Sequence, residues 1–326
     1  MSFDRSNEGH AGGAGIRTVW ITGGHGFIGR HLAASLRTSA EIVAGIGHGA
    51  WTDREREQCG FSHWLNSEIS LGSLGQMRGV TGNPDIVFHL AGGSSVGAAV
   101  ANPLEDFKRT VSSTAELLEW LRQFCPETVL VAVSSAAVYG TAGFDKIPES
   151  AVLSPVSPYG SHKQMMEELC QSYARCYGIR AVLPRLFSVY GPGLRKQLLW
   201  DLCEKIRNGG RIALGGTGAE QRDWVQVADV TRALRAVVAL ADSTARAVNI
   251  ATGIATSVRD VALEVIRAWG PDAAGAKVVF GGQSRPGDPA NLVADVGLMG
   301  SLGLGAAVPL RKGIVEYVMW FRSLTG

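Results

Sequence analysis

Short apolar runs alternate with stretches of helical spacing through the first half of the chain. Apolar runs that end near glycine or serine occupy residues 17–22, 41–46, 85–90 and 129–133, and a fifth run occupies 180–183. Amphipathic spacing between them predicts helices over residues 27–36, 104–124 and 159–177. Strands that alternate with helices through short connections form parallel sheets, so the pattern predicts an α/β fold with a doubly wound parallel Rossmann sheet.

The pattern changes after residue 183. Helices are predicted at 197–208, 225–241, 258–269 and from 312, with short strands at 247–250 and 278–280. We therefore expect a Rossmann domain over 16–183, to which 225–256 returns. Residues 184–224 and 257–326 are expected to form a smaller, interwoven C-terminal substrate-binding lobe. Residues 1–15 are polar and glycine-rich, lack the apolar stretch of a secretory signal, and are interpreted as a mobile tail.

Composition narrows the class of protein. The formal charge of +2 and the absence of a Lys/Arg-rich run give no indication of a nucleic-acid partner. No apolar segment approaches the ~18 residues that span a bilayer, so no membrane partner is expected. Five cysteines without C-x-x-C spacing favour a reducing cytoplasm over a disulfide framework. Seven histidines show no paired ligand spacing, so no metal site is expected.

A glycine-rich turn follows the first predicted strand and opens the first predicted helix. Glycines allow backbone N–H groups to approach a pyrophosphate, and the helix N-terminus adds partial positive charge. The spacing Gly24-x-Gly26-x-x-Gly29 in this context favours a dinucleotide site over a turn without a ligand. The residues assigned to this site are Gly23, Gly24, Gly26, Phe27, Ile28 and Gly29.

The second predicted strand ends without the carboxylate that usually binds the ribose of NAD. That acid is expected about 20 residues after the glycine turn, where the chain reads Gly45-Ile46-Gly47-His48-Gly49. With no acid to repel a 2′-phosphate, the predicted cofactor is NAD or NADP. His48 is either a source of positive charge for it or a plain surface residue. Glu68, with Ile69 beside it, is either an acceptor for the adenine amino group or a solvated loop residue.

Tyr159 and Lys163 lie four positions apart in a predicted helix and therefore share one face. A tyrosine, with a pKa near ~10, needs a much lower pKa to act as a base near neutrality. We expect cationic Lys163 and an oxidised nicotinamide to lower it. Ser135 follows the fourth strand, at the carboxyl edge where such folds place ligands, and its hydroxyl is expected to hold a substrate oxygen. The alternatives are a core role for Tyr159 and a nucleophilic Ser135, which lacks a His/Asp partner pattern.

These segments together resemble the extended short-chain dehydrogenases of the nucleotide-sugar epimerase/dehydratase group. Thr22–Gly29 is similar to TGGxGFIG, Ser134–Gly140 to SSATVYG, and Tyr159–Lys163 to YxxxK. Further similar segments are His89–Gly92, Arg185–Pro192, Arg222–Val225 and Arg285–Asp288. The resemblance runs from about residue 17 to 323. It implies a homodimeric, cytoplasmic enzyme that acts on a nucleotide-diphosphate sugar.

The resemblance also implies roles for single residues. Ser135, Tyr159 and Lys163 form its catalytic set, and Tyr159 and Lys163 also contact the cofactor. The other implied site residues are Leu90, Ala91 and Gly92 for the cofactor, and Ser94, Ser135, Ala136, Ser188, Arg222 and Arg285 for the substrate, with the two arginines on its diphosphate. Ser94 and Ser188 stand where the family has a lysine and an asparagine.

The implied reaction is epimerisation at C4 of the sugar. Tyr159 removes the proton of the C4 hydroxyl while hydride passes to the nicotinamide, and the 4-keto sugar then receives hydride on its other face. Ala136-Ala137 stand where dehydratases carry Asp-Glu, so dehydration is not expected. An NADPH-dependent 4-keto-sugar reductase is the alternative, favoured by the missing ribose acid. A non-catalytic dinucleotide-binding sensor is the third reading.

Overall fold

A parallel sheet forms the centre of the computed structural model, which describes residues 16–143, 145–209, 211–273, 275–282 and 291–324. Eight strands run in the order β11-β7-β5-β4-β1-β2-β3, with β6 paired to β7, and all these pairings are parallel. The strands are β1 (Thr18–Thr22), β2 (Ile42–Gly47), β3 (His63–Asn66), β4 (Ile86–His89), β5 (Val129–Ala132), β6 (Ser134–Ser135), β7 (Ala181–Leu186) and β11 (Arg246–Ile250). The predicted doubly wound sheet is confirmed.

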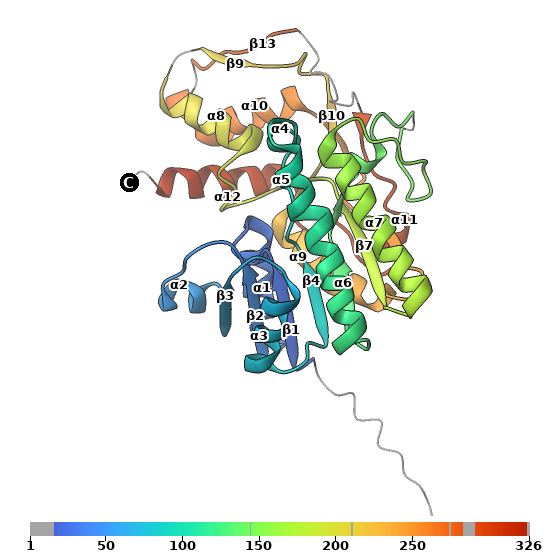
Figure 1. Ribbon diagram of the computed structural model, residues 1–326. Coiled ribbons are helices and arrows are strands. Elements are labelled where there is room, and N and C mark those ends of the chain that lie inside the picture. The colour runs from blue at the N-terminus through green and yellow to red at the C-terminus, as the bar shows by residue number, and fades with distance from the viewer. Residues whose placement is uncertain (1–15, 144, 210, 274, 283–290, 325–326) are drawn as a thin grey trace, which may run out of the picture.

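Helices cover both faces of this sheet (Figure 1). One layer contains α1 (Phe27–Leu36), α9 (Val227–Ala236) and α11 (Gly297–Ser301), and the other contains α3 (Leu71–Thr81), α6 (Ser113–Phe124) and α7 (Pro158–Tyr177). Successive strand residues point to opposite faces, so Val19 and Ile21 enter one core while Trp20 enters the other. Burial on both faces explains why the strands are apolar throughout.

A smaller lobe lies above the carboxyl ends of the strands (Figure 1). Its core joins α8 (Gln197–Arg207), α10 (Val258–Trp269) and α12 (Leu310–Ser323) with the paired strands β9 (Ile212–Leu214) and β13 (Val278–Phe280). A second small sheet places β10 (Gln221–Gln226) beside β8 (Ser188–Tyr190), β12 (Ala255–Ser257) and β14 (Asn291–Leu292). The remaining elements are α2 (Asp53–Gln58), α4 (Val96–Ala101), α5 (Pro103–Phe107), η1 (Lys108–Ser112), η2 (Ala136–Tyr139), η3 (Val237–Leu240) and η4 (Pro271–Ala273).

Three predicted helices differ from the structure by two residues or more, and the one expected from 312 begins at Leu310. The helix expected from residue 225 begins at Val227, because Val225 pairs with Val189 as part of β10. The helix expected over 104–124 is divided by the π-helical turn η1 into α5 and α6. The tail expected at 1–15 lies outside the described residues. None of the helices in the described ranges combines the length and apolar content that a bilayer crossing requires.

Candidate active site

The glycine turn after β1 is too closely packed to accept side chains. A Cβ on Gly23, whose φ is +67°, would lie 2.8 Å from the Ala91 nitrogen, and a Cβ on Gly29 would lie 2.7 Å from the Gly23 oxygen. A Cβ on Gly24 would lie 2.6 Å from the Phe61 ring. The turn therefore packs closely at the carboxyl edge of the sheet with bare backbone at these positions, and we call it the glycine cradle.

Helix α1 begins directly after that cradle. Its N-cap is Gly26, which offers no side chain to cap the first N–H groups. Uncapped N–H groups and the positive end of the helix dipole together favour a bound anion. The fit between this turn and a pyrophosphate thus rests on two observations, the Cβ-free cradle and the uncapped helix start.

Aromatic and cationic side chains lie beside the turn, at the end of β2. The His25 ring contacts Trp51 edge-on at 4.7 Å, and the Arg30 guanidinium lies 4.4 Å from the Trp51 ring centroid. Sequence reasoning missed this cluster. The predicted cofactor residues His48 and Glu68 are exposed nearby, whereas Ile69 is partly buried against the sheet. Their cofactor roles stay predictions.

The segment after β4 connects the glycine turn to helix α7. Leu90 and Ala91 donate backbone hydrogen bonds to the carbonyl and hydroxyl oxygens of Thr22, at 3.2 and 3.1 Å. A Cβ on Gly92 would lie 3.2 Å from the Lys163 Nζ atom. Residues 90–92 therefore place the predicted cradle directly next to the predicted catalytic lysine.

Lys163 is buried on α7. Its Nζ atom donates a 2.8 Å hydrogen bond to the carbonyl oxygen of Val133, the residue that follows β5. Burial lowers the pKa of Lys163 to about 8, against the opposing effect of the Asp106 and Glu167 carboxylates. The ammonium is therefore held at the sheet edge by backbone, rather than left in solvent.

Ser135 and Tyr159 form a hydrogen-bonded pair. Ser135 ends β6 and caps η2, since its hydroxyl oxygen also accepts the Ala137 N–H at 3.2 Å. Burial raises the pKa of the Tyr159 phenol, and the hydrogen bond with Ser135 offsets only part of this effect. The Asp106 carboxylate raises the pKa of Tyr159 further. Ala136, predicted to line the substrate, is buried in η2.

In the chain alone the pKa of Tyr159 is raised, and the expected lowering by Lys163 together with an oxidised nicotinamide stays a prediction. The Lys163 ammonium donates to Val133, and the desolvation of the phenol dominates its ionisation. The free-energy cost of ionising a partly buried phenol, which the sequence does not reveal, opposes that lowering.

A buried ion pair links helix α7, which carries Lys163, to the strands beside Ser135. Glu167, one turn after Lys163 on α7, accepts hydrogen bonds from Arg185 of β7 at 3.0 and 2.7 Å and from the Ser134 hydroxyl. Arg185 also donates to the Tyr139 hydroxyl at 3.0 Å. This network fixes α7 against the strand that carries Ser135. The sequence analysis had Arg185 only as part of a family segment and did not find Glu167.

The predicted substrate residues come from both sides of the site. Ser188 of β8 lies beside Trp224 of β10, and Arg222, which is buried in β10, donates a 2.8 Å hydrogen bond to the Gln221 carbonyl oxygen. Exposed Ser94 lies on the sheet side, where its carbonyl oxygen accepts a 3.2 Å hydrogen bond from Lys196. Arg285 lies outside the described residues.

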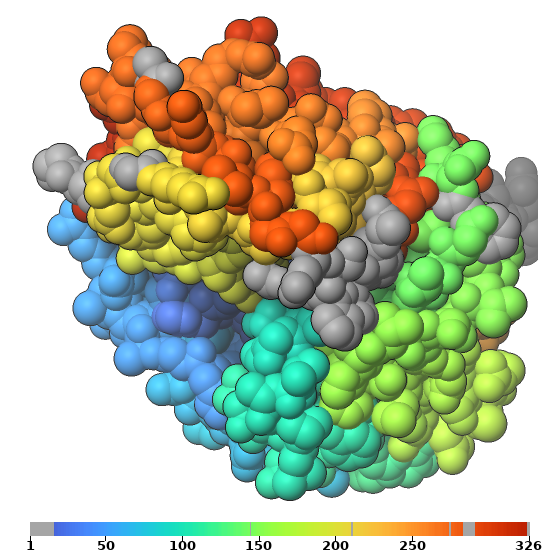
Figure 2. Space-filling view, turned by 90° about the horizontal axis from the view of Figure 1, so that it is seen from above, coloured from blue at the N-terminus to red at the C-terminus, as the bar shows by residue number. Residues whose placement is uncertain are grey.

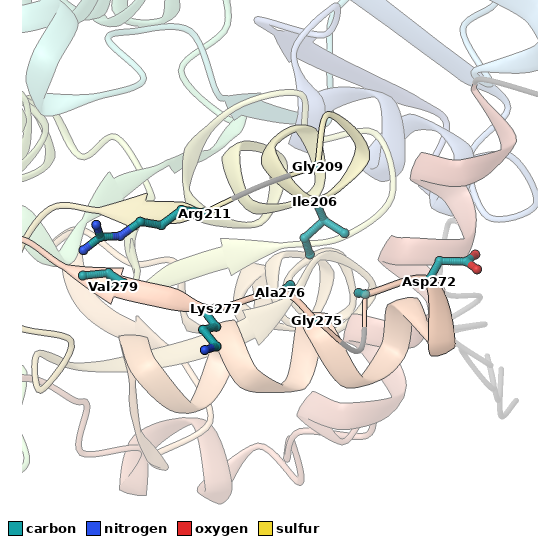
Figure 3. Close-up of a pocket in the computed structure, with 9 residues that line it drawn as sticks. Ile206, Gly209, Arg211, Asp272, Gly275, Ala276, Lys277 and Val279 are labelled. Carbon is teal, nitrogen blue, oxygen red and sulfur yellow. The ribbon is translucent and has the colours of Figure 1, made fainter.

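Lys196 was not predicted, and it links the two parts of the chain across this edge. Figure 2 shows the recess where the yellow segment of the lobe meets the blue N-terminal part. A separate open cavity of about 510 Å³ lies in the outer part of the lobe (Figure 3). Its lining comes from Ile206, Gly209, Arg211, Asp272, Ala273, Gly275, Ala276, Lys277 and Val279. It shares no residue with the predicted site.

The described residues contain no group of three or more His, Cys, Asp or Glu side chains placed to hold a metal ion. His89 illustrates the structural use of such residues. It is fully buried, and its ring nitrogens pair with the Thr22 and Thr114 hydroxyls at 2.8 and 2.9 Å. Burial and the nearby Lys163 lower its pKa to about 3, so the ring is neutral.

Comparison with known proteins agrees with this geometry. The model of the NAD dependent epimerase/dehydratase family matches residues 19–251. A putative UDP-glucose 4-epimerase of Methanocaldococcus jannaschii is 27% identical over 94% of this chain and 98% of its own. The crystal structure of a Thermotoga maritima UDP-glucose 4-epimerase with UDP-glucose is 25% identical, covers 95% of this chain and 100% of its own, and has a TM-score of 0.84.

A second solved structure, MoeE5 in complex with UDP-glucuronic acid and NAD, is 29% identical. The match covers 94% of this chain and 99% of that one, with a TM-score of 0.80. The family model spans the glycine turn, the segment after β4 and the Ser135/Tyr159/Lys163 set, which are the parts that the structure brings together. The chain therefore belongs to the NAD-dependent epimerase/dehydratase family.

Proposed function

We propose that this protein is an NAD-dependent nucleotide-sugar epimerase that inverts C4 of the sugar through a 4-keto intermediate. One observation carries the proposal: Ser135, Tyr159 and Lys163 gather at the carboxyl edge of the sheet, next to the glycine cradle. A phenol, a hydroxyl and an ammonium at the mouth of a dinucleotide cradle suit the oxidation of an alcohol beside a nicotinamide.

The cradle and the start of α1 would hold the pyrophosphate of the cofactor, and Lys163 would hold its nicotinamide ribose. A bound nicotinamide supplies the hydride acceptor and, when oxidised, a positive charge that favours the phenolate. We assign NAD rather than NADP because MoeE5, 29% identical, was crystallised with NAD. The absence of an acid after β2 is the feature that leaves NADP to be tested.

Tyr159 acts as the base that takes the C4 hydroxyl proton. The Ser135 hydroxyl, already paired with the phenol, orients the same substrate oxygen. The charges of the buried Lys163 ammonium and of an oxidised nicotinamide would favour the phenolate, against burial, which raises the pKa of Tyr159 in the chain alone. When the keto sugar is reduced on its other face, Tyr159 returns the proton to the oxygen.

We propose a nucleotide-diphosphate sugar of the uridine series as substrate. The support is the pair of similar structures that hold UDP-glucose and UDP-glucuronic acid. Arg222, with Arg285, would bind its diphosphate, which the guanidinium fork suits. Ser94, Ala136 and Ser188 would line the sugar.

We further propose a cytoplasmic homodimer assembled through the helices of residues 104–124 and 159–177. Large apolar side chains are exposed on both helices, among them Leu104, Phe124 and Met165. Exposed apolar side chains on adjacent helices suit a subunit interface. Sedimentation that shows only monomer at micromolar concentration would contradict the dimer.

The test is turnover of a panel of UDP-hexoses and UDP-glucuronic acid by the protein with added NAD, followed by NMR of the sugar. The wild type should interconvert C4 epimers of at least one sugar. Tyr159→Phe should lose about 10²–10⁴-fold in kcat while it keeps NAD binding. The matched control is Tyr177→Phe, on the exposed end of the same helix, which should keep full activity.

Three other results would overturn the proposal. Consumption of NADPH with a 4-keto sugar, without epimerisation, would identify a reductase. Equal nucleotide binding by wild type and Tyr159→Phe, with no turnover by either across the panel, would identify a sensor. Full activity in Tyr159→Phe would remove the phenol from the mechanism.

A further inference from the structure

A buried carboxylate and a buried imidazole face each other behind the catalytic set. The Asp106 Oδ2 atom of α5 lies 2.6 Å from the His162 Nδ1 atom of α7, and the two side chains are 5% and 11% exposed. The Phe107 ring contacts the His162 ring edge-on at 5.5 Å between centroids. Burying a carboxylate without a partner costs free energy, so the contact with His162 offsets part of the cost of burying Asp106. The proposed reaction leaves it without a role.

Asp106 also contacts the turn that follows β4. A Cβ on Gly93 would lie 1.7 Å from an Asp106 carboxylate oxygen, so the carboxylate occupies the space beside that glycine. The adjacent glycine, Gly92, lies against the Lys163 ammonium. Two consecutive glycines thus separate a buried negative charge from the buried positive charge of the proposed catalytic set.

His162 places this pair within the catalytic helix. It directly precedes Lys163 and lies three residues after Tyr159. The partner of Asp106 therefore lies on the same helix as Tyr159 and Lys163. The Thr110 hydroxyl, on η1 after α5, accepts the Gly93 N–H at 2.8 Å and fixes the turn between them. A displacement of Asp106 would therefore shift both the turn after β4 and helix α7.

We propose that Asp106 and His162 are positioning residues for the reaction: Asp106, held by His162, places a fixed negative charge beside the turn, keeps Lys163 cationic and sets the pH at which Tyr159 ionises. The expected effect on the pH–rate profile rests on the proposed function, whereas the expected effect on the pKa of Tyr159 does not. The Asp106 carboxylate raises the pKa of both Tyr159 and Lys163, which agrees with this placement.

Other charges around the site are fixed by partners or lie in solvent. Glu167 is paired with Arg185, and Lys163 is bound to a backbone carbonyl. Within the part of the chain that the structure describes, the remaining titratable groups near Tyr159 and Lys163 are Cys170 of α7, Tyr139 of η2 and His89 of β4. The remaining charged side chains of α5 and η1, namely Glu105, Lys108 and Arg109, are exposed. Asp106 is therefore the carboxylate whose removal should change the ionisation of Tyr159.

The experiment is a spectroscopic titration of Tyr159 in the full chain with bound NAD. Tyrosinate absorbance is recorded against pH for each protein and for the same protein carrying Tyr159→Phe, and the difference isolates this phenol. Asp106→Asn removes the charge and keeps the size of the side chain. Glu105→Gln is the matched control, because it removes the same charge from the exposed neighbouring residue.

Asp106→Asn should lower the pKa of Tyr159, and the acidic limb of the pH–rate profile should move to lower pH in the same variant. Glu105→Gln should leave both unchanged, because solvent screens its charge. His162→Asn keeps the Asp106 charge and should not lower the pKa of Tyr159.

An unchanged or raised pKa of Tyr159 in Asp106→Asn would overturn the inference. An equal fall in Glu105→Gln or in His162→Asn would also overturn it, since that would show loosened packing or a general charge effect. If Asp106→Asn does not fold, the His162→Asn titration still tests the inference. Absence of turnover in the wild type would refute the proposed function, while the titration of Tyr159 would still measure the effect of Asp106.

Discussion

The Glu167–Arg185 pair offers the clearest quantitative test of how this fold positions its site. Both side chains are at most 5% exposed, and the carboxylate accepts two hydrogen bonds from the guanidinium and one from Ser134. Glu167→Ala removes all three acceptor contacts and leaves the Arg185 charge buried. Breaking a buried ion pair by removing one partner costs about 3–5 kcal/mol of unfolding free energy.

The same reasoning predicts almost no effect one residue further along α7. Glu168 is exposed and accepts a 3.0 Å hydrogen bond from Gln164. Glu168→Ala should therefore change the unfolding free energy by no more than about 0.5 kcal/mol. The two variants change the same residue type on the same helix, so their difference isolates burial and pairing.

The measurement is urea unfolding of both variants and of the wild type, monitored by circular dichroism. The midpoints of the three transitions are then compared. Glu167→Ala should unfold at a clearly lower urea concentration, and it should also lose turnover, because Ser134 adjoins Ser135. Midpoints that agree between Glu167→Ala and Glu168→Ala would refute the argument that this pair anchors α7 to the strand edge.

Two further predictions concern the cradle and the buried histidine. Gly29→Ala should weaken NAD binding about tenfold or more in equilibrium titration, because its Cβ would lie 2.7 Å from the Gly23 oxygen; Gly75→Ala, with open space around it, should bind as wild type does. His89 has a pKa of about 3 in the fold and about 6.5 when unfolded, so stability should fall with pH below about 6.5, by up to about 1.4 kcal/mol per pH unit. His89→Gln should flatten that slope in urea unfolding from pH 7 towards about pH 4, and an unchanged slope would contradict the neutral buried ring.

The sequence was sufficient for the fold because the sheet is buried on both faces. Continuous apolar runs marked five strands, and helical spacing gave α1 at Phe27–Leu36 with both ends as predicted. The strands β8 and β12 were missed, because three residues are too few to show a period; β13, equally short, was predicted from its three consecutive apolar residues. Val225 was assigned to a helix because its pairing with β8 is a long-range contact that local spacing does not record.

The site was predictable where function depends on backbone or on spacing along one helix. Glycines at fixed spacing identify the cradle, and Tyr159 and Lys163 share a helix face. The pairing of Asp106 with His162 joins residues 56 positions apart, and no local signal marks a carboxylate that will be buried. The raised pKa of Tyr159 in the chain alone was not predicted, because desolvation depends on tertiary packing.

The most direct test of the central claim, that Tyr159 serves a hydride transfer at C4, is an isotope experiment on a UDP-hexose that the protein turns over, deuterated at C4. The reaction is run in ordinary water with NAD, and NMR of both C4 epimers locates the label. Because the hydride removed from C4 returns to C4, deuterium should stay there in both epimers, and Tyr159→Phe should form the product far more slowly. Replacement of the C4 deuterium by solvent hydrogen in the product would contradict the claim.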